Sequence, residues 1–450
     1  MERLIMKKLE GWKLSPIRKP LIVRGARQVG KSHTITEFGK TSFKGRIHVV
    51  DFEKHPDWKA VFDKNLDPVR IVGELEVLLN TKITQGEDLL FLDEIQAAPK
   101  AIMSMRYFHE EMPELHVIAA GSLLEFELKN ISFPVGRVNL ITMAPMNFYE
   151  FLKGAGMEKL AEIIASPPAI LPDSIHNTLI DLLRQYLFIG GMPECVKVWL
   201  HSKSMADVFT IQSDLINTYR QDFSKYAPHA DKRSLSHALS SVVRNIGHTV
   251  KYTNLSNEFT GPTNKKAFDL LNLARIVHKI HAASPASLPL HATASEKKFK
   301  AILVDTGLIR SLSELPATIE YPKNDLLNMY QGALAEQFAG QEFISGGIEN
   351  LHYWSREAKN SSAEVDYLIV RNNAVCPVEI KGGAAGKLRS MHLLLQQYPH
   401  IEKGYVLSTN VYGELPEQRL VFLPLYYSWW LVNAMNSGIS KESSLKGGFP

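Results

Sequence analysis

One segment near the amino end constrains the fold of this 450-residue chain more than any other. The segment LIVRGARQVGKSHTITEF places the pattern Gly-x-x-x-x-Gly-Lys-Ser between a short apolar run and a polar stretch with helical spacing. In this setting glycine permits a tight turn, and the N–H groups of the loop converge at the start of a helix, where the backbone favours an anion. The sequence therefore predicts a strand, a phosphate-binding loop and a helix, in that order.

The residues predicted to surround a bound nucleotide follow one another without a break in this loop. They are Gly25, Ala26, Arg27, Gln28, Val29, Gly30, Lys31, Ser32 and His33. Lys31 is expected to place a positive charge on the β- and γ-phosphates, and the Ser32 hydroxyl is expected to bind Mg²⁺. ATP and Mg²⁺ are accordingly the predicted cofactors, and a glycine-rich turn without a ligand is the alternative.

Two apolar runs farther along the chain end in polar residues that suit the same site. LLFLDEI ends near Asp93 and Glu94, and HVIAAGS ends in Ser122. Buried parallel strands deliver the residues at their carboxyl ends to one edge of a sheet. Asp93 is predicted to hold Mg²⁺, Glu94 to activate the attacking water and Ser122 to sense the γ-phosphate, with ordinary strand-ending turns as the alternative.

These segments resemble the AAA-type P-loop ATPases, and most closely a prokaryotic family that joins such a domain to a carboxyl-terminal nuclease-like domain. The resemblance rests on GARQVGKS, LLFLDEIQ, AAGSLLEF, FPVGRVNLITMAPMNFYEF and YLFIGGMPECV. It implies an ATP-hydrolysing core. It also nominates Arg137, in PVGRV, as an arginine that reaches the nucleotide of a neighbouring subunit in a homo-oligomer, whereas a solvated surface charge is the other explanation for this residue.

A second group of reactive side chains lies in the segment AEVDYLIVRNNAVCPVEIKGG. Asp366 stands in one strand candidate, and Glu379 and Lys381 stand in the next, with a turn near residues 371–373 between them. Residues two apart in a strand share a face, so Glu379 and Lys381 should project together and a hairpin should bring Asp366 beside them. Two carboxylates can hold Mg²⁺, and the lysine can stabilise charge on a phosphate under attack.

The spacing Asp-x12-Glu-x-Lys resembles the core of the PD-(D/E)XK nucleases, although Val365 stands where the pattern of that family begins with proline. This resemblance implies that Glu336, in the preceding helical segment, completes a metal shell with Asp366 and Glu379. A surface hairpin with alternating charges is the alternative.

The order of the segments predicts an α/β chain. Four apolar runs, at 21–23, 47–50, 89–92 and 116–120, alternate with helical segments and predict an AAA-type parallel P-loop sheet. A helical lid, a winged helix and a small α/β nuclease-like domain are predicted to follow. The predicted ranges are 1–155 for the ATPase core, 156–229 for the lid, 230–318 for the winged helix and 325–430 for the nuclease-like domain.

Composition limits the partners and the compartment. With 51 Lys+Arg against 47 Asp+Glu, the net charge of +4 does not indicate a polycationic nucleic-acid coat. Lys265 and Lys266 in the predicted winged helix could meet DNA phosphates, or they could be solvated charges at the start of a helix. Two cysteines provide no disulfide framework, and no apolar run is long enough to span a membrane. We therefore expect a cytoplasmic protein without a membrane partner.

Two functions remain open from the sequence. In the first, an Mg²⁺-dependent ATPase couples ATP binding and hydrolysis to a nuclease-like domain that acts on DNA, which the combination of Asp366, Glu379 and Lys381 favours. In the second, ATP controls a signalling or regulatory switch, and the nuclease-like domain is a non-catalytic docking domain for a protein. A metabolic kinase is disfavoured because the chain has no evident small-substrate domain.

Overall fold

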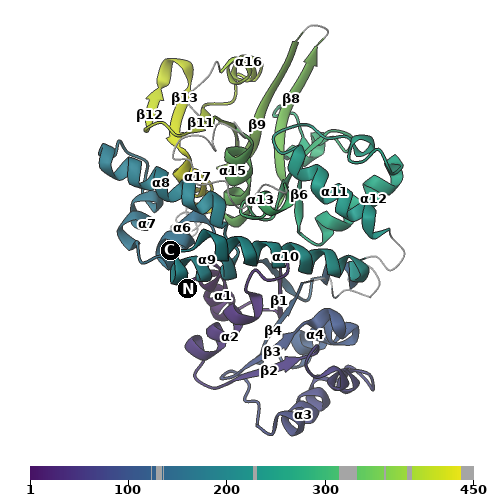
Figure 1. The fold of residues 1–450 in the computed structure, drawn as a ribbon. Coiled ribbons are helices and arrows are strands. Elements are labelled where there is room, and N and C mark those ends of the chain that lie inside the picture. The colour runs from purple at the N-terminus through teal and green to yellow at the C-terminus, as the bar shows by residue number, and fades with distance from the viewer. Residues whose placement is uncertain are drawn as a thin grey trace, which may run out of the picture. The chain divides into compact units, whose positions relative to one another are not determined.

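The computed structural model describes residues 1–122, 124–127, 134, 136–226, 231–313, 332–358, 361–382 and 388–436 (Figure 1). The chain divides into two compact units. The first consists of Met1–Ala144 with the short segment Leu273–Arg275, and the second holds the remainder of the chain. The range 1–155 given to the ATPase core stays a prediction.

The first unit is built on a parallel five-stranded sheet. Its strands are β1 (Leu21–Arg24), β2 (Ile47–Asp51), β3 (Leu89–Asp93), β4 (His116–Gly121) and β5 (Asn139–Thr142), in the order β2-β3-β4-β1-β5. The strands predicted from the four apolar runs are confirmed. The fifth strand, β5, is half exposed, and for this reason its sequence lacks the uniform apolar character of a strand covered on both faces.

One helix precedes the first strand, and the others lie in the connections between strands. They are α1 (Ile5–Leu14), α2 (Lys31–Ser42), α3 (Pro68–Leu79), α4 (Pro99–Glu111) and α5 (Leu124–Glu127). The start of α3 illustrates the local cause, because the Asp67 side chain accepts hydrogen bonds from the N–H groups of Val69 and Arg70, and Pro68 occupies the first helical position. Every residue of β3 and β4 is buried, so the carboxyl ends of these strands rest on a packed core.

The second unit begins with a helical region, as the sequence predicts. Its helices are α6 (Phe148–Gly154), α7 (Glu158–Ala165), α8 (Asp173–Ile189), α9 (Pro193–Ser202) and α10 (Met205–Tyr226). In the part of the chain that the structure describes, no helix combines the length and the apolar character needed to cross a membrane.

A mixed eight-stranded sheet forms the rest of the second unit (Figure 1). Its strands are β6 (Val277–Ala282), β7 (Phe299–Leu303), β8 (Leu351–Ala358), β9 (Ser361–Arg371), β10 (Ala374–Ile380), β11 (Gly404–Ser408), β12 (Gly413–Leu415) and β13 (Leu420–Pro424), in the order β12-β13-β11-β10-β9-β8-β6-β7. The helices that accompany it are α11 (Lys232–Arg244), α12 (Gly261–Leu273), α13 (Leu308–Leu312), α15 (Ala333–Ser345), α16 (Arg389–Gln397) and α17 (Ser428–Asn436).

The prediction of a winged helix separate from the nuclease-like domain is wrong in one respect. Strands β6 and β7 do pair as an antiparallel hairpin, but β6 also pairs in parallel with β8 through residues 280–282 and 351–353. The two strands expected to form a wing are therefore part of the eight-stranded sheet. A sequence pattern marks a segment as extended but does not identify a pairing partner far along the chain. The predicted start of the nuclease-like domain, 325–331, lies outside the described residues.

Candidate nucleotide site and carboxylate cluster

The predicted phosphate-binding loop turns sharply between β1 and α2. Gly30 adopts φ +93°, and Gly25 lies so close to the backbone of Met143 that an added Cβ would come within 2.2 Å of its carbonyl oxygen. Helix α2 begins at Lys31, directly after this turn. The two glycines are therefore required by the path of the backbone, and the loop leads into a helix amino terminus that favours an anion.

The other side chains of the loop fall into two groups. Ala26 and Val29 are fully buried, whereas Arg27, Gln28 and His33 are partly or fully exposed. The buried pair anchors the loop on the sheet, and the three polar side chains lie at its solvent-facing side.

Lys31 is the charged group of the loop. Its side chain is buried, and its Nζ donates hydrogen bonds to the carbonyl oxygens of Gly25 at 3.0 Å and Ala26 at 2.9 Å. These bonds hold the ammonium against the loop into which the phosphates of a nucleotide would fit.

Ser32 and Asp93 meet at the carboxyl edge of the sheet. Their side chains lie near each other, although they belong to the loop after β1 and to the end of β3. Burial is the main cause that raises the pKa of Asp93, and the negative charges of Glu94 and Asp51 add to it, while the Ser32 hydroxyl and the Glu94 N–H lower it; together they raise this pKa to about 6. A hydroxyl beside a carboxylate in an electronegative setting fits Mg²⁺, which binds through one or two protein ligands and completes its shell with phosphate oxygens and water.

Glu94 has an unusual backbone conformation for a residue with a side chain. Its φ of +49° and ψ of 44° lie in the left-handed region, and its N–H donates to Asp93 Oδ1 at 3.0 Å. The Gln96 side chain donates from Nε2 to Glu94 Oε2. Such strained positions occur at functional sites, where the surrounding structure maintains them.

Gln96 was not predicted as a site residue. It fits because Gly121 has no side chain, since a Cβ there would come within 2.3 Å of Gln96 Oε1. The available signal was its position in LLFLDEIQ, two residues after Glu94. Ser122 follows Gly121 at the end of β4 and is buried. Because β4 lies between β3 and β1, Ser122 stands at the same sheet edge as Asp93 and the phosphate-binding loop.

Arg137 lies at the opposite edge of this sheet. It precedes β5, whose first residue Asn139 is paired with Leu21 at the start of β1, whereas the phosphate-binding loop follows the end of β1. The exposed Arg137 side chain donates from Nε to Glu110 Oε1 at 2.9 Å. Within its own chain, Arg137 therefore does not reach the loop.

In the second unit, three carboxylates surround the ammonium group of Lys300. Its Nζ lies 2.9 Å from Glu336 Oε1, 2.5 Å from Glu364 Oε1 and 3.2 Å from Asp366 Oδ1. Burial alone would lower the pKa of Lys300, but the charges of Glu336, Asp366 and Glu364 outweigh burial and raise this pKa well above its usual range. Lys300 belongs to the fully buried strand β7. Neither Lys300 nor Glu364 was predicted as a site residue, although a lysine inside the apolar run FKAIL was an available signal.

The predicted trio is also brought together at this cluster. Lys381 Nζ donates to Glu379 Oε1 at 2.6 Å, and Asp366 Oδ2 accepts the N–H of Ile380 at 2.8 Å. Burial and the nearby charge of Asp366 raise the pKa of Glu379. The expected shared face of Glu379 and Lys381 is thus observed.

The carboxylates predicted as a metal shell, those of Glu336, Asp366 and Glu379, are all paired with lysines. Lys300 contacts the first two carboxylates, and Lys381 contacts the third. Over the described ranges of the chain, no group of three His, Cys, Asp or Glu side chains is placed to hold a metal ion.

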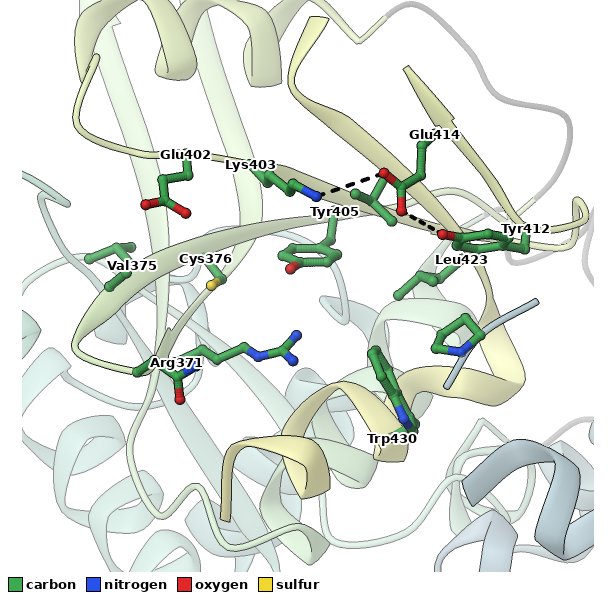
Figure 2. A pocket seen from close by; sticks show the side chains of 14 residues that line it. Arg371, Val375, Cys376, Glu402, Lys403, Tyr405, Tyr412, Glu414, Leu423 and Trp430 are labelled. Carbon is green, nitrogen blue, oxygen red and sulfur yellow. Dashed lines mark hydrogen bonds and ion pairs between the residues drawn. The ribbon is translucent and has the colours of Figure 1, made fainter. Parts of the chain in front are cut away.

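A cavity of about 470 Å³ lies elsewhere in the second unit. Figure 2 shows the Arg371 side chain extending into it toward Trp430, with 5.5 Å between the guanidinium carbon and the centre of the indole ring. Cys376 also lines the cavity, and burial raises the pKa of its thiol to about 11, which keeps it protonated at neutral pH. None of the predicted site residues lines this cavity.

Comparisons with known families divide the chain into three segments. Residues 17–152 match a family described as an AAA domain, residues 180–318 match a domain of unknown function, DUF8612, and residues 331–427 match another, DUF4143. A search of curated proteins gave no match.

Three solved structures resemble parts of the fold. A Walker-type ATPase of Pyrococcus abyssi has a TM-score of 0.43 at 13% identity, with 68% of this chain and 94% of that chain covered. PCH-2 of C. elegans has a TM-score of 0.28 at 12% identity, with 45% and 62% covered. AMPPCP-bound DnaA from Aquifex aeolicus has a TM-score of 0.27 at 14% identity, with 60% and 86% covered.

The family match and the sheet agree on the first unit. The matched segment contains the loop, its strand, and the strands that end at Asp93 and at Gly121. The chain therefore carries an AAA-type P-loop ATPase domain at its amino end, which implies ATP binding and hydrolysis, followed by the DUF8612 and DUF4143 domains.

Proposed function

We propose that this protein binds ATP with Mg²⁺ at the loop of residues 25–33 and hydrolyses it there. The position of Ser32 beside Asp93 carries the proposal, because it brings the loop to the acidic end of β3 at one edge of the sheet. Mg²⁺ bound by this hydroxyl and carboxylate would neutralise charge on the phosphates. Lys31 supplies a second positive charge at the phosphates, and Glu94 accepts a proton from the attacking water.

The position of Gln96 supports the role of Glu94. By donating to Glu94 Oε2, Gln96 leaves the other carboxylate oxygen available to a water molecule. Ser122, at the end of β4, is the proposed sensor of the γ-phosphate, because its hydroxyl can donate to a phosphate oxygen. Phosphate release from ATP, measured with Mg²⁺ and again after chelation with EDTA, tests the proposal. Turnover that persists in EDTA would contradict the metal role given to Ser32 and Asp93.

In the second unit, the carboxylate cluster favours a docking or regulatory module and argues against a nuclease that acts on DNA. The observation that favours docking is the position of Lys300 among Glu336, Glu364 and Asp366. In this function, the nucleotide state of the first unit controls a protein partner bound by the second. Contact between DNA and the exposed Lys265 and Lys266 on α12 remains a prediction.

We expect the wild-type protein to leave DNA uncut. Labelled single-stranded, duplex and branched DNA, incubated with Mg²⁺ or Mn²⁺ and with or without ATP, provides the measurement. The Asp366→Ala variant is the control that separates this site from a contaminating nuclease. The wild-type protein could cut DNA while Asp366→Ala hydrolyses ATP but does not cut DNA. That result would favour the DNA nuclease and contradict the docking function.

Arg137 is proposed to act on the nucleotide of a neighbouring subunit in a homo-oligomer. This proposal accounts for an arginine that lies at the sheet edge opposite its own loop. Arg137→Ala should lower turnover by about tenfold or more without a comparable loss of ATP affinity, because such an arginine stabilises charge in the transition state.

A mixing experiment tests whether Arg137 acts between subunits. Lys31→Ala subunits, which keep Arg137, should restore turnover to Arg137→Ala subunits, which keep an intact loop. Assembly is followed by light scattering in the same samples. A mixed oligomer that forms and stays inactive would argue against action between subunits.

A further inference from the structure

The surroundings of the Lys300 ammonium resemble those of a bound metal ion. A lysine ammonium has three N–H donors, and three carboxylates surround this one, those of Glu336, Glu364 and Asp366 at 2.9, 2.5 and 3.2 Å. They come from α15 and β9, while Lys300 comes from β7. A single positive charge therefore links three elements of the second unit.

The burial of Lys300 and Glu336 makes their pairing necessary. The Lys300 side chain is 1% exposed, and that of Glu336 is 7% exposed. A buried charge is costly unless it is paired and hydrogen-bonded, so Lys300 and Glu336 depend on each other, whereas the side chains of Asp366 and Glu364 are 17% and 35% exposed. Lys300 also lies 5.3 Å from the centre of the Tyr353 ring, which adds a favourable contact for a cation.

The remaining oxygen atoms offer little to a metal ion. Asp366 Oδ2 accepts the Ile380 N–H, and Glu379 Oε1 accepts from Lys381. Glu379 Oε2 is buried without a hydrogen-bond partner. Because Lys300 pairs with Glu336 and Asp366 and Lys381 pairs with Glu379, Mg²⁺ would have to displace an ammonium group to reach these carboxylates. The side chains therefore do not fit the metal that the spacing Asp-x12-Glu-x-Lys implies.

We infer that Lys300 takes the place of a divalent cation in this cluster. Like a metal, it holds the carboxylates together. Unlike a metal, it has no further coordination position for water or phosphate, so it cannot generate a metal-bound nucleophile. The inference rests on the proposed docking function and specifies which residue closes the site to Mg²⁺ and Mn²⁺.

Replacement of Lys300 by methionine should create a cation site. Methionine keeps most of the length of lysine but removes its charge, so Glu336, Glu364 and Asp366 are left for a divalent ion, for which carboxylates are suitable ligands. Mn²⁺ binding is measured by electron paramagnetic resonance of the free ion, without nucleotide and in an Asp93→Asn background that removes the carboxylate of the first unit. Lys300→Met should bind one Mn²⁺ at least about tenfold more tightly than the Lys300 protein, and Mn²⁺ should raise its Tm.

Two further variants control the experiment. Lys279→Met removes a largely buried lysine of β6 that pairs at 2.9 Å with the exposed Glu296, outside the cluster, and should gain no Mn²⁺ site. The double variant Lys300→Met with Glu336→Gln lowers the unbalanced negative charge, so it should fold where the single variant does not and should still bind Mn²⁺.

Two results would overturn the inference. One is a folded Lys300→Met protein, single or double, that binds Mn²⁺ no more tightly than the Lys300 protein. The other is a Lys300 protein that already binds Mn²⁺ at a site lost in Asp366→Asn. If the Lys300 protein binds Mn²⁺ at this site but cuts no DNA, the role given to Lys300 is rejected, while the docking function is not contradicted.

Discussion

Replacement of Lys31 by alanine should weaken ATP binding by at least about a hundredfold, equivalent to about 3 kcal/mol. Lys31 is the buried cation of the loop, and its Nζ lies on the carbonyl oxygens of Gly25 and Ala26, next to the predicted position of the phosphates. Alanine leaves the charge of the β- and γ-phosphates without this partner. Titration with a fluorescent ATP analogue measures the loss.

The matched control is Lys40→Ala on the same helix. Lys40 is exposed and pairs with Glu37 at 3.1 Å, away from the loop, so its removal should leave ATP affinity unchanged. If Lys31→Ala binds ATP as tightly as Lys40→Ala does, the nucleotide does not bind at this loop as proposed.

Replacement of Glu94 by glutamine should separate binding from hydrolysis. Glutamine has nearly the same shape as glutamate but cannot accept the proton of the attacking water. ATP affinity should stay within about twofold, while turnover falls by about a hundredfold or more. Single-turnover phosphate release, together with the titration used for Lys31→Ala, measures both quantities.

Glu37→Gln is the control for this change. Glu37 lies on the surface of α2 and should tolerate the same substitution without effect on turnover. Full activity in Glu94→Gln would remove Glu94 from the mechanism and point to another base for the water molecule.

The nucleotide site could be predicted from the sequence because its parts are local. The loop is a continuous segment, and β1, β3 and β4 are apolar runs that end in, or just before, Gly25, Asp93 and Ser122. Once such strands are parallel neighbours, their carboxyl ends must meet at one edge. The sequence places Gln96 two residues after Glu94 but does not indicate their hydrogen bond, because this contact depends on the close approach of Gly121.

The carboxylate cluster could be predicted only in part, for the opposite reason. Asp366, Glu379 and Lys381 come from one hairpin, so strand alternation brings them together. Lys300 comes from a strand that was assigned to a separate winged helix, and its pairing with the later strands depends on the sheet formed by β6 and β8. The expected metal ligands Glu336 and Asp366 are thus paired with a lysine that no local pattern connects to them.

Steady-state phosphate release from ATP by the wild-type protein and by Lys31→Ala, measured side by side with Mg²⁺, tests most directly whether this chain hydrolyses ATP at the proposed loop. Both proteins should show the same melting curve without nucleotide, so that any difference in turnover reports on the site. We predict steady turnover by the wild-type protein and none above background by Lys31→Ala. Equal rates in the two proteins, or no turnover by the wild-type protein across a range of concentrations that includes its assembled state, would contradict ATP hydrolysis at this loop.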